Sequence, residues 1–218
     1  MATKRPLQTV SVAEAATNQL RESLFAGAYT AGEEIKDTQV ADEYGIARPT
    51  ARIAVQQLIN EGMLVREPGY SARVRRFDPA QVRDIFRVRK LIELDAVREV
   101  KASGQPLDAV REAMERFAGL GDDLVWSKIA EADAAFHRAV VEVGGSPRLR
   151  SYFDALLNEI RLLLALPEEH FGRGSSPYEE HEELFLMLQG DATVKQLEKA
   201  WAFHLDESRD FLVRQLSD

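Results

Sequence analysis

The chain contains no cysteine among its 218 residues, which excludes disulfide bridges and thiolate metal sites. No stretch approaches the roughly 18 consecutive apolar residues of a membrane-spanning helix. The N-terminal segment MATKRPLQTV lacks the apolar core of a secretory signal peptide. An excess of positive charge is also missing, because the formal net charge is -8. We therefore expect a cytoplasmic protein with no membrane contact, and the total charge alone does not suggest nucleic-acid binding.

The charge is distributed unevenly along the chain. Up to Phe77 there are ten Lys and Arg residues against nine Asp and Glu, whereas the remainder holds 18 against 27. Hydrophobic residues make up 45% and charged residues 29%, the balance of an ordinary globular protein. The segment up to Phe77, here called the head, is nearly neutral, and the remainder, here called the body, is acidic. This difference predicts two modules with different partners.

The head contains the start and stop signals of three short helices, followed by those of a hairpin. Ser11 and Glu14 form a capping box that starts the first helix. Two further helices are predicted at 37–44 and 48–61, each followed by glycine. Two β-like runs, MLVRE and SARVRRF, then flank a Pro-Gly turn. This order is typical of a winged helix-turn-helix, so residues 1–77 are predicted to form such a domain.

The body reads as helix almost throughout. Asp78, Pro79 and Gln81 make a strong helix start. No strand signal follows, and the longest irregular stretch, 167–177, is of a kind often functional or mobile in compact bundles. We predict an all-α bundle of about six helices over residues 78–218, so the whole chain is mostly α. Further helix starts are predicted at Gln105-Pro106, near Asp122 or Asp123, at Ser146-Pro147, at Ser176-Pro177 and at Asp191.

The helix that begins at Arg48 has one apolar face and an opposite face free of acidic residues. Arginine can bind guanine or clamp a phosphate, and glutamine can read adenine. A helix entering the major groove by its N-terminus would bring Arg48 and Arg52 nearest to the DNA. A merely solvated helix face is the alternative, but the order of three helices and a wing favours DNA binding. The candidate DNA-binding residues are Arg48, Thr50, Arg52, Gln56, Arg73 and Arg75.

A second group of candidates lies in the body. Asp133 and His137 are four residues apart, so a helix would present both on one face. His181 and His204 fall on two other predicted helices, and a bundle can direct all four side chains to one point. Imidazole nitrogens and a carboxylate suit Zn²⁺, Ni²⁺, Mn²⁺ or Fe²⁺. Ordinary packed histidines are the alternative, and His170, in the irregular stretch, is not expected to be a ligand.

Two long segments resemble one family. The segment GEEIKDTQVADEYGIARPTARIAVQQLINEGMLVRE resembles the DNA-binding domain of GntR-type bacterial transcription regulators. EADAAFHRAVVEVGGSPRL, followed by EEHEELFLMLQGDATVKQLEKAWAFHL, resembles the FCD domain of the FadR-type members, in their shorter VanR-like branch. The recognition helix departs from the family pattern in places: Ala47 replaces serine, proline and threonine are exchanged at Pro49 and Thr50, and Ile53 replaces glutamate.

The resemblance implies a ligand-responsive transcription regulator. We expect a homodimer on an inverted-repeat operator in double-stranded DNA, and a repressor before an activator. The resemblance further implies that Asp133, His137, His181 and His204 bind one divalent metal ion, with Zn²⁺ the first expectation. That metal would help to bind a small carboxylic acid effector.

Arg89 matches the family's first body helix, where it could face the effector carboxylate or pair with Glu93 four residues on. Arg161 is a second candidate for the effector carboxylate. Two other functions remain open from the sequence: a metal-dependent hydrolase or lyase, and a constitutive DNA-binding protein with a structural metal.

Overall fold

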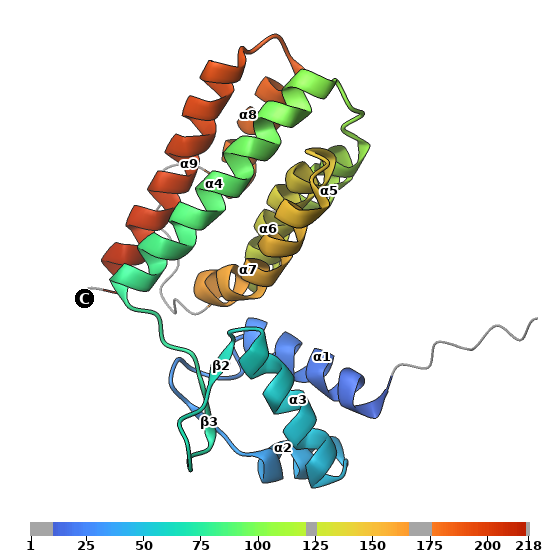
Figure 1. Ribbon diagram of the computed structural model, residues 1–218, viewed down its shortest axis with the longest axis vertical. Coiled ribbons are helices and arrows are strands. Elements are labelled where there is room, and N and C mark those ends of the chain that lie inside the picture. The colour runs from blue at the N-terminus through green and yellow to red at the C-terminus, as the bar shows by residue number, and fades with distance from the viewer. Residues whose placement is uncertain (1–10, 121–125, 166–175, 217–218) are drawn as a thin grey trace, which may run out of the picture. The chain divides into compact units, whose positions relative to one another are not determined.

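The computed structural model describes residues 11–120, 126–165 and 176–216. It divides into two compact units, Met1–Arg76 and Phe77–Asp218 (Figure 1). Helices dominate both units, and the one sheet among the described residues is small and lies in the first unit. The predicted fold class, a winged helix-turn-helix followed by an all-α bundle, is confirmed. Within the described ranges no helix has both the length and the apolar character needed to span a membrane.

The first unit combines three helices with a three-stranded antiparallel sheet of order β1-β3-β2. The strand β1 was not predicted, because two residues are too few to show a periodicity. It pairs Glu34 with Arg73 and Ile35 with Ala72. The elements are α1 (Val12–Phe25), β1 (Glu34–Ile35), α2 (Asp37–Tyr44), α3 (Arg48–Asn60), β2 (Leu64–Val65) and β3 (Ala72–Val74).

The helix α3 is held by its apolar face. Ala54 and Leu58 are fully buried, as is Leu20 on α1, which packs against α3. At the end of α3, Arg21 donates from Nε and Nη2 to the two carboxylate oxygens of Glu61 at 2.9 and 2.8 Å. This packing fixes α3 on one side and leaves its other side free for a partner.

The second unit is a bundle of six helices within the described residues. Its boundaries agree with several predicted starts: Asp78 and Gln81 form the capping box of the first helix, and Ser176 and Glu179 form that of the fifth. The helices are α4 (Pro79–Ser103), α5 (Asp108–Ala118), α6 (Trp126–Val143), α7 (Pro147–Ala165), α8 (Pro177–Gln189) and α9 (Val194–Gln215).

Two helix starts differ from prediction. The last helix begins at Val194, not Asp191, because Thr193 supplies the capping side chain to the backbone of Gln196. Likewise α5 begins at Asp108, after the predicted Gln105-Pro106 start. The start expected near residues 122–123 and residues 167–175 of the predicted loop lie outside the described residues.

The long helix α4 organises the bundle, since it packs against α9, α6 and α7 (Figure 1). Ile92 and Ala96 of α4 join Val141 and Phe153 in one apolar cluster. Gly144, just after α6, lies so close to α4 that a Cβ atom there would come within 2.8 Å of the Cα atom of Ala96. The close packing of α4 and α6 matters for the site, because both helices contribute polar side chains to the interior.

Candidate metal centre and nucleic-acid interface

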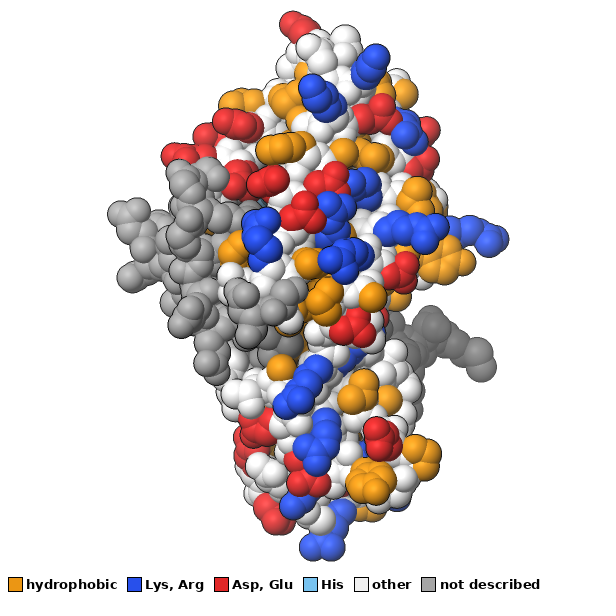
Figure 2. All heavy atoms as spheres, turned by 90° about the vertical axis from the view of Figure 1, so that its left-hand side faces the viewer, with side chains coloured by type: hydrophobic (Ala, Val, Ile, Leu, Met, Phe, Trp, Pro, Cys, Tyr) orange, Lys and Arg blue, Asp and Glu red, His pale blue; other side chains and the backbone are white. Residues whose placement is uncertain are grey.

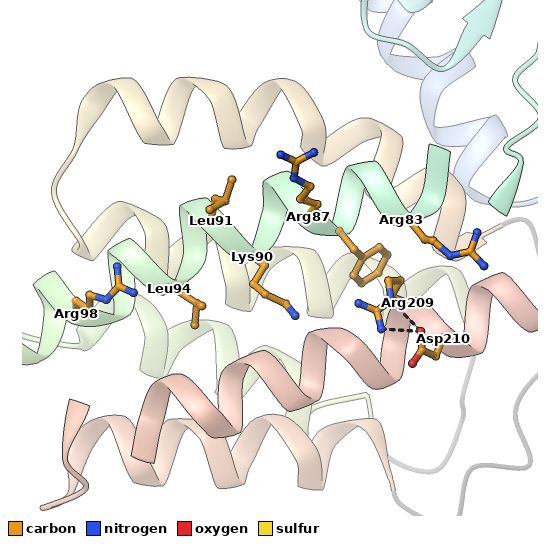
Figure 3. Close-up of a pocket in the computed structure, with 9 residues that line it drawn as sticks. Arg83, Arg87, Lys90, Leu91, Leu94, Arg98, Arg209 and Asp210 are labelled. Atoms are coloured by element: carbon orange, nitrogen blue, oxygen red, sulfur yellow. Dashed lines mark hydrogen bonds and ion pairs between the residues drawn. The ribbon is translucent and has the colours of Figure 1, made fainter. Parts of the chain in front are cut away.

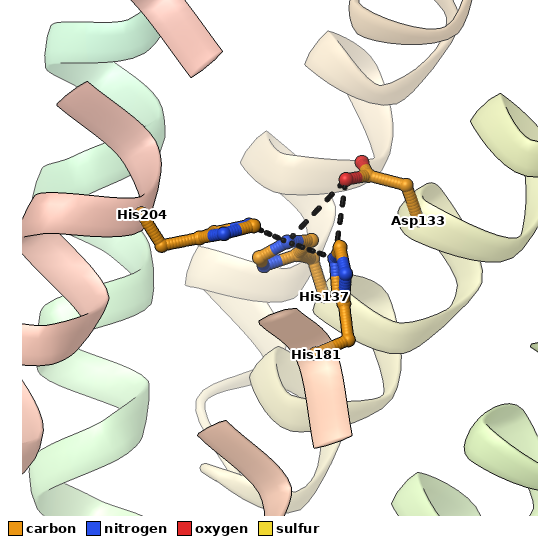
Figure 4. A group of neighbouring side chains, drawn as sticks. All are labelled: Asp133, His137, His181 and His204. Carbon is orange, nitrogen blue, oxygen red and sulfur yellow. Dashed lines mark hydrogen bonds and ion pairs between the residues drawn. The ribbon is translucent and has the colours of Figure 1, made fainter. Parts of the chain in front are cut away.

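Four polar side chains from three helices meet inside the bundle (Figure 4). Asp133 and His137 project from α6 one turn apart, His181 comes from α8 and His204 from α9. One ligand atom of each lies within 4.8 Å of the others. The three histidines are buried, and the Asp133 side chain is 14% exposed. The structure therefore brings together the four residues that the sequence put forward as metal ligands.

The spacing of the ligand atoms fits a metal ion. His137 Nε2 lies 3.2 Å from His181 Nε2 and 3.3 Å from His204 Nε2. Asp133 Oδ1 lies 3.2 Å from His181 Nε2 and 3.7 Å from His137 Nε2. Ligand atoms about 2.1 Å from a metal are separated by about 3.0 Å at octahedral angles and by about 3.4 Å at tetrahedral angles. The four separations of 3.2–3.7 Å are of this size.

The opposite nitrogens of the three rings face acceptors. His137 Nδ1 lies 2.6 Å from Glu93 Oε2, and His181 Nδ1 lies 2.7 Å from the carbonyl oxygen of Pro177. His204 Nδ1 lies 3.5 Å from Glu180 Oε2. A carbonyl only accepts, so His181 donates through Nδ1, and in a neutral ring Nε2 then carries the lone pair. The same tautomer follows for His137, and all three Nε2 atoms point to the common centre.

This arrangement suits a bound cation. Burial lowers the pKa of His137, although Glu93 opposes the shift, and this favours the neutral ring. Burial likewise lowers the pKa of His204 to about 4, although Glu180 opposes the shift. Two neutral nitrogens whose lone pairs face each other cannot hydrogen-bond to one another. A divalent metal between them would accept both lone pairs. Asp133, His137, His181 and His204 therefore fit a divalent metal ion.

Glu93 is a part of the site that the sequence did not reveal. Its carboxylate, fully buried, accepts three hydrogen bonds of 2.6 Å, from Arg89 Nε, His137 Nδ1 and Trp201 Nε1. Burial alone would raise the pKa of Glu93, but the positive charge of Arg89 and the hydrogen bonds from His137 and Trp201 lower it to about 2. The sequence signal that could have revealed Glu93 is its position among the apolar residues that α4 directs to the core.

Arg89 lies in the interior, 1% exposed. Besides Glu93, its guanidinium contacts Asp133, with Nη2 3.4 Å from Oδ2. Burial raises the pKa of Asp133, but the positive charge of Arg89 holds it well below its usual range. Arg89 thus makes the Glu93 pair considered from the sequence and also positions a candidate metal ligand.

A small cavity adjoins three of the four candidate ligands, Asp133, His181 and His204. Its volume is about 30 Å³, which is enough to hold ordered water. The walls are mostly apolar, and Ser208 adds a hydroxyl group. Neither Arg89 nor the half-buried Arg161 of α7 lines it. The cavity is lined by Ile129, Ala130, Asp133, Leu164, Pro177, Glu180, His181, His204, Ser208, Phe211 and Leu212.

A larger hollow of about 610 Å³ lies on the bundle surface between α4 and α9 (Figure 3). Basic side chains follow α4 along it, and α9 supplies Arg209 and Asp210. Lys90 and Arg209 both contact Asp206 at 2.5 Å, and Arg98 pairs with Glu198. Figure 2 shows this interleaving of basic and acidic side chains on the bundle face. None of the four candidate ligands lines the hollow, so it is separate from the buried centre.

In the first unit, the candidate DNA-binding residues lie on exposed surfaces. Arg48, Arg52 and Gln56 are exposed on α3, whereas Thr50 is half-buried. Arg52 Nε lies 3.4 Å from Asp37 Oδ2, and the same carboxylate accepts from Arg66 at 2.7 Å. The ion pair with Asp37 restrains the Arg52 side chain, which is still 74% exposed.

The β2–β3 hairpin carries the basic wing. Arg73 is exposed and donates to the Gly32 carbonyl, and the half-buried Arg75 donates to the Gly62 carbonyl. A row of basic side chains is visible on the side of this unit that faces the viewer in Figure 2. The unit thus has a polar helix face and a basic hairpin, the two parts of a winged helix that contact DNA.

Comparison with known proteins identifies both units. The family description "Bacterial regulatory proteins, gntR family" matches residues 12–74, and the FCD domain matches residues 84–206. The chain is 23% identical over 171 residues to YdhC, an HTH-type transcriptional regulator of Bacillus subtilis (strain 168), with 77% of this chain and 76% of YdhC covered.

Solved structures show the same fold. A GntR transcriptional regulator from Rhodococcus sp. RHA1 superposes with a TM-score of 0.83 at 18% identity, over 92% of this chain and 97% of that one. E. coli McbR/YncC superposes with a TM-score of 0.76 at 20% identity, over 95% and 99%. The family matches favour a regulator over the hydrolase or lyase considered from the sequence. The chain belongs to the GntR family of bacterial transcription regulators and carries an FCD effector-binding domain.

Proposed function

We propose that the bundle binds one divalent metal ion through Asp133, His137, His181 and His204, and that a small carboxylic acid binding there lowers the affinity of the head for operator DNA. One observation carries the proposal. Three buried imidazoles have Nδ1 directed to acceptors and Nε2 directed to a common centre beside a carboxylate. Zn²⁺ is the first expectation, and Ni²⁺, Mn²⁺ and Fe²⁺ suit the same ligands.

The charges around the site suit a divalent cation. The carboxylates of Glu93, Asp133 and Glu180 contact the imidazoles, and the guanidinium of Arg89 offsets one of them. The sum is two negative charges, which a divalent metal balances. When bound, the metal supplies a Lewis-acidic centre for the carboxylate oxygens, since four protein ligands leave about two positions of an octahedral shell.

The cavity restricts the size of the acid. At about 30 Å³ it is far smaller than the usual ligand pocket of roughly 300–1,000 Å³. The apolar walls suit a short carbon chain, and the Ser208 hydroxyl suits a second oxygen. A longer acid would require the surrounding helices to move apart. The same tightness favours a second candidate function, a constitutive DNA-binding protein with a structural metal only.

The head supplies the DNA contacts in this proposal. Arg48, Thr50, Arg52 and Gln56 of α3 enter the major groove, and Arg73 and Arg75 of the hairpin hold phosphates. A homodimer with two-fold symmetry matches an inverted-repeat operator. The acid can change operator affinity only if it binds two arrangements of the protein unequally.

The test combines thermal stability with gel shift. Short hydroxy, keto, sugar and dicarboxylic acids are screened for an increase in melting temperature of the metal-loaded, full-length protein. A ligand at a hundred times its dissociation constant contributes about 2.7 kcal/mol. Each hit is then added to a gel shift on a selected operator. We expect weaker DNA binding, and we expect the effect to vanish after chelation and in His181→Ala.

Two results would contradict this account. A hit that survives chelation and His181→Ala would place the acid elsewhere, and Arg87→Ala in the α4–α9 hollow would be the variant to test next. Hits that bind through the metal without altering operator affinity would instead support the structural-metal function. Val12→Ala, an exposed substitution in the head, serves as the control for general effects on stability.

A further inference from the structure

A large aliphatic side chain stands exposed on the polar face of α3. Ile53 is 59% exposed, while the apolar residues of the opposite face, Ala54 and Leu58 among them, are fully buried. It lies next to Arg52 and one turn before Gln56, on the face that reads DNA in the proposed function. The inference below rests on that proposed function.

The neighbours of Ile53 already have polar partners. Arg52 is steadied by Asp37, as described above. Gln56 donates from Nε2 to the side-chain oxygen of Asn60 at 3.1 Å. Polar side chains that can contact bases thus lie on both sides of Ile53. The aliphatic side chain of Ile53 can neither donate nor accept a hydrogen bond. It offers only van der Waals contact and apolar surface.

The major groove offers one matching group. The edges of the base pairs present donors and acceptors, and the C5-methyl group of thymine is the apolar feature among them. Ile53 is the sixth residue of α3, within the half of a recognition helix that contacts base edges. Its β-branched side chain has restricted rotamers, so little side-chain freedom is lost on contact.

We propose that Ile53 determines part of the operator specificity by packing against the C5-methyl group of a thymine in each half-site. Burial of one methyl-sized group accounts for roughly a fourfold gain in affinity per half-site. The preferred base at this position is therefore thymine even though no hydrogen bond from Ile53 reads it.

Deoxyuridine tests this contact, because it differs from thymidine only by the missing methyl group. An operator is first selected from a random duplex pool with the full-length protein. Each thymine is then replaced by deoxyuridine at both symmetric positions, and dissociation constants are measured for the parent, Ile53→Ala and Val12→Ala. Val12, on α1, is also an exposed β-branched aliphatic residue, which makes it a matched control.

We expect one symmetric pair of positions at which deoxyuridine weakens binding of the parent and of Val12→Ala by roughly fourfold per half-site. At that pair, Ile53→Ala should bind thymine and uracil operators equally. Equal sensitivity of parent and Ile53→Ala at every position would overturn the contact while leaving the DNA-binding role intact. Failure to select any duplex would overturn the DNA-binding role, and this inference with it.

Discussion

Replacing Glu93 with glutamine removes the negative charge at the centre of the bundle while almost preserving the side-chain shape. In the native protein this carboxylate accepts from Arg89, His137 and Trp201 at 2.6 Å each. An amide group has only one oxygen. Whichever way it is oriented, its NH₂ group faces either Arg89 or the pair His137 and Trp201, and a donor then meets a donor.

The magnitude follows from burial. Glu93 and Arg89 are both buried from solvent, and after the substitution Asp133, 3.4 Å away, is the counter-charge that the guanidinium keeps among the described residues. Removing one partner of a buried ion pair costs about 3–5 kcal/mol. Loss of the acceptor that orients a metal-binding histidine typically weakens metal affinity about 10–100-fold. We expect both effects in Glu93→Gln.

The assay is urea denaturation of the metal-free protein together with a competitive metal titration against a chromophoric chelator. Glu99→Gln, an exposed residue on the same helix, is the control and should match the parent in both. Trp201→Phe removes a single donor to Glu93 and should weaken metal binding less, which keeps the test valid if Glu93→Gln does not fold. Parent-like stability and metal affinity in Glu93→Gln would refute the role of this carboxylate.

Further outcomes are expected elsewhere in the chain. The metal-free protein should lose stability as the pH falls from about 6.5 toward 4, because the pKa of His204 is lowered to about 4 and the unfolded chain takes up its proton first; a urea midpoint unchanged over this range would contradict this. Gly144→Ala should destabilise the bundle by about 1–3 kcal/mol in the same assay, since its Cβ would meet the backbone of Ala96. Arg52→Ala should weaken operator binding by about 1–3 kcal/mol in a gel shift, and parent-like affinity would remove Arg52 from the reading surface. Arg73→Ala should instead reduce the salt dependence of binding, and an unchanged slope would exclude a phosphate contact.

Local sequence signals were sufficient for the fold class. The capping box at Asp78 marked the start of α4, and helical spacing placed Asp133 and His137 on one face. The hydrogen-bond partners that orient the histidines could not be predicted from such local signals. Glu93 and Trp201 are 108 residues apart, and only the packing of α4 against α9 brings them together.

The role of Arg89 shows the same limit. Spacing along α4 allowed a pair with Glu93, and the structure contains that pair. The contact with Asp133 on α6 depends on how the two helices pack, which no local pattern specifies. The strand β1 was missed for a related reason, because Glu34 and Ile35 form a strand only by pairing with β3.

A native mass spectrum of protein purified without chelator tests the central claim most directly. The account predicts about one divalent metal per chain, and near zero in His137→Ala and His204→Ala. His170→Ala, outside the described residues, should keep the metal. A parent protein that is free of metal, and takes up none when Zn²⁺, Ni²⁺, Mn²⁺ or Fe²⁺ is added, would contradict the account.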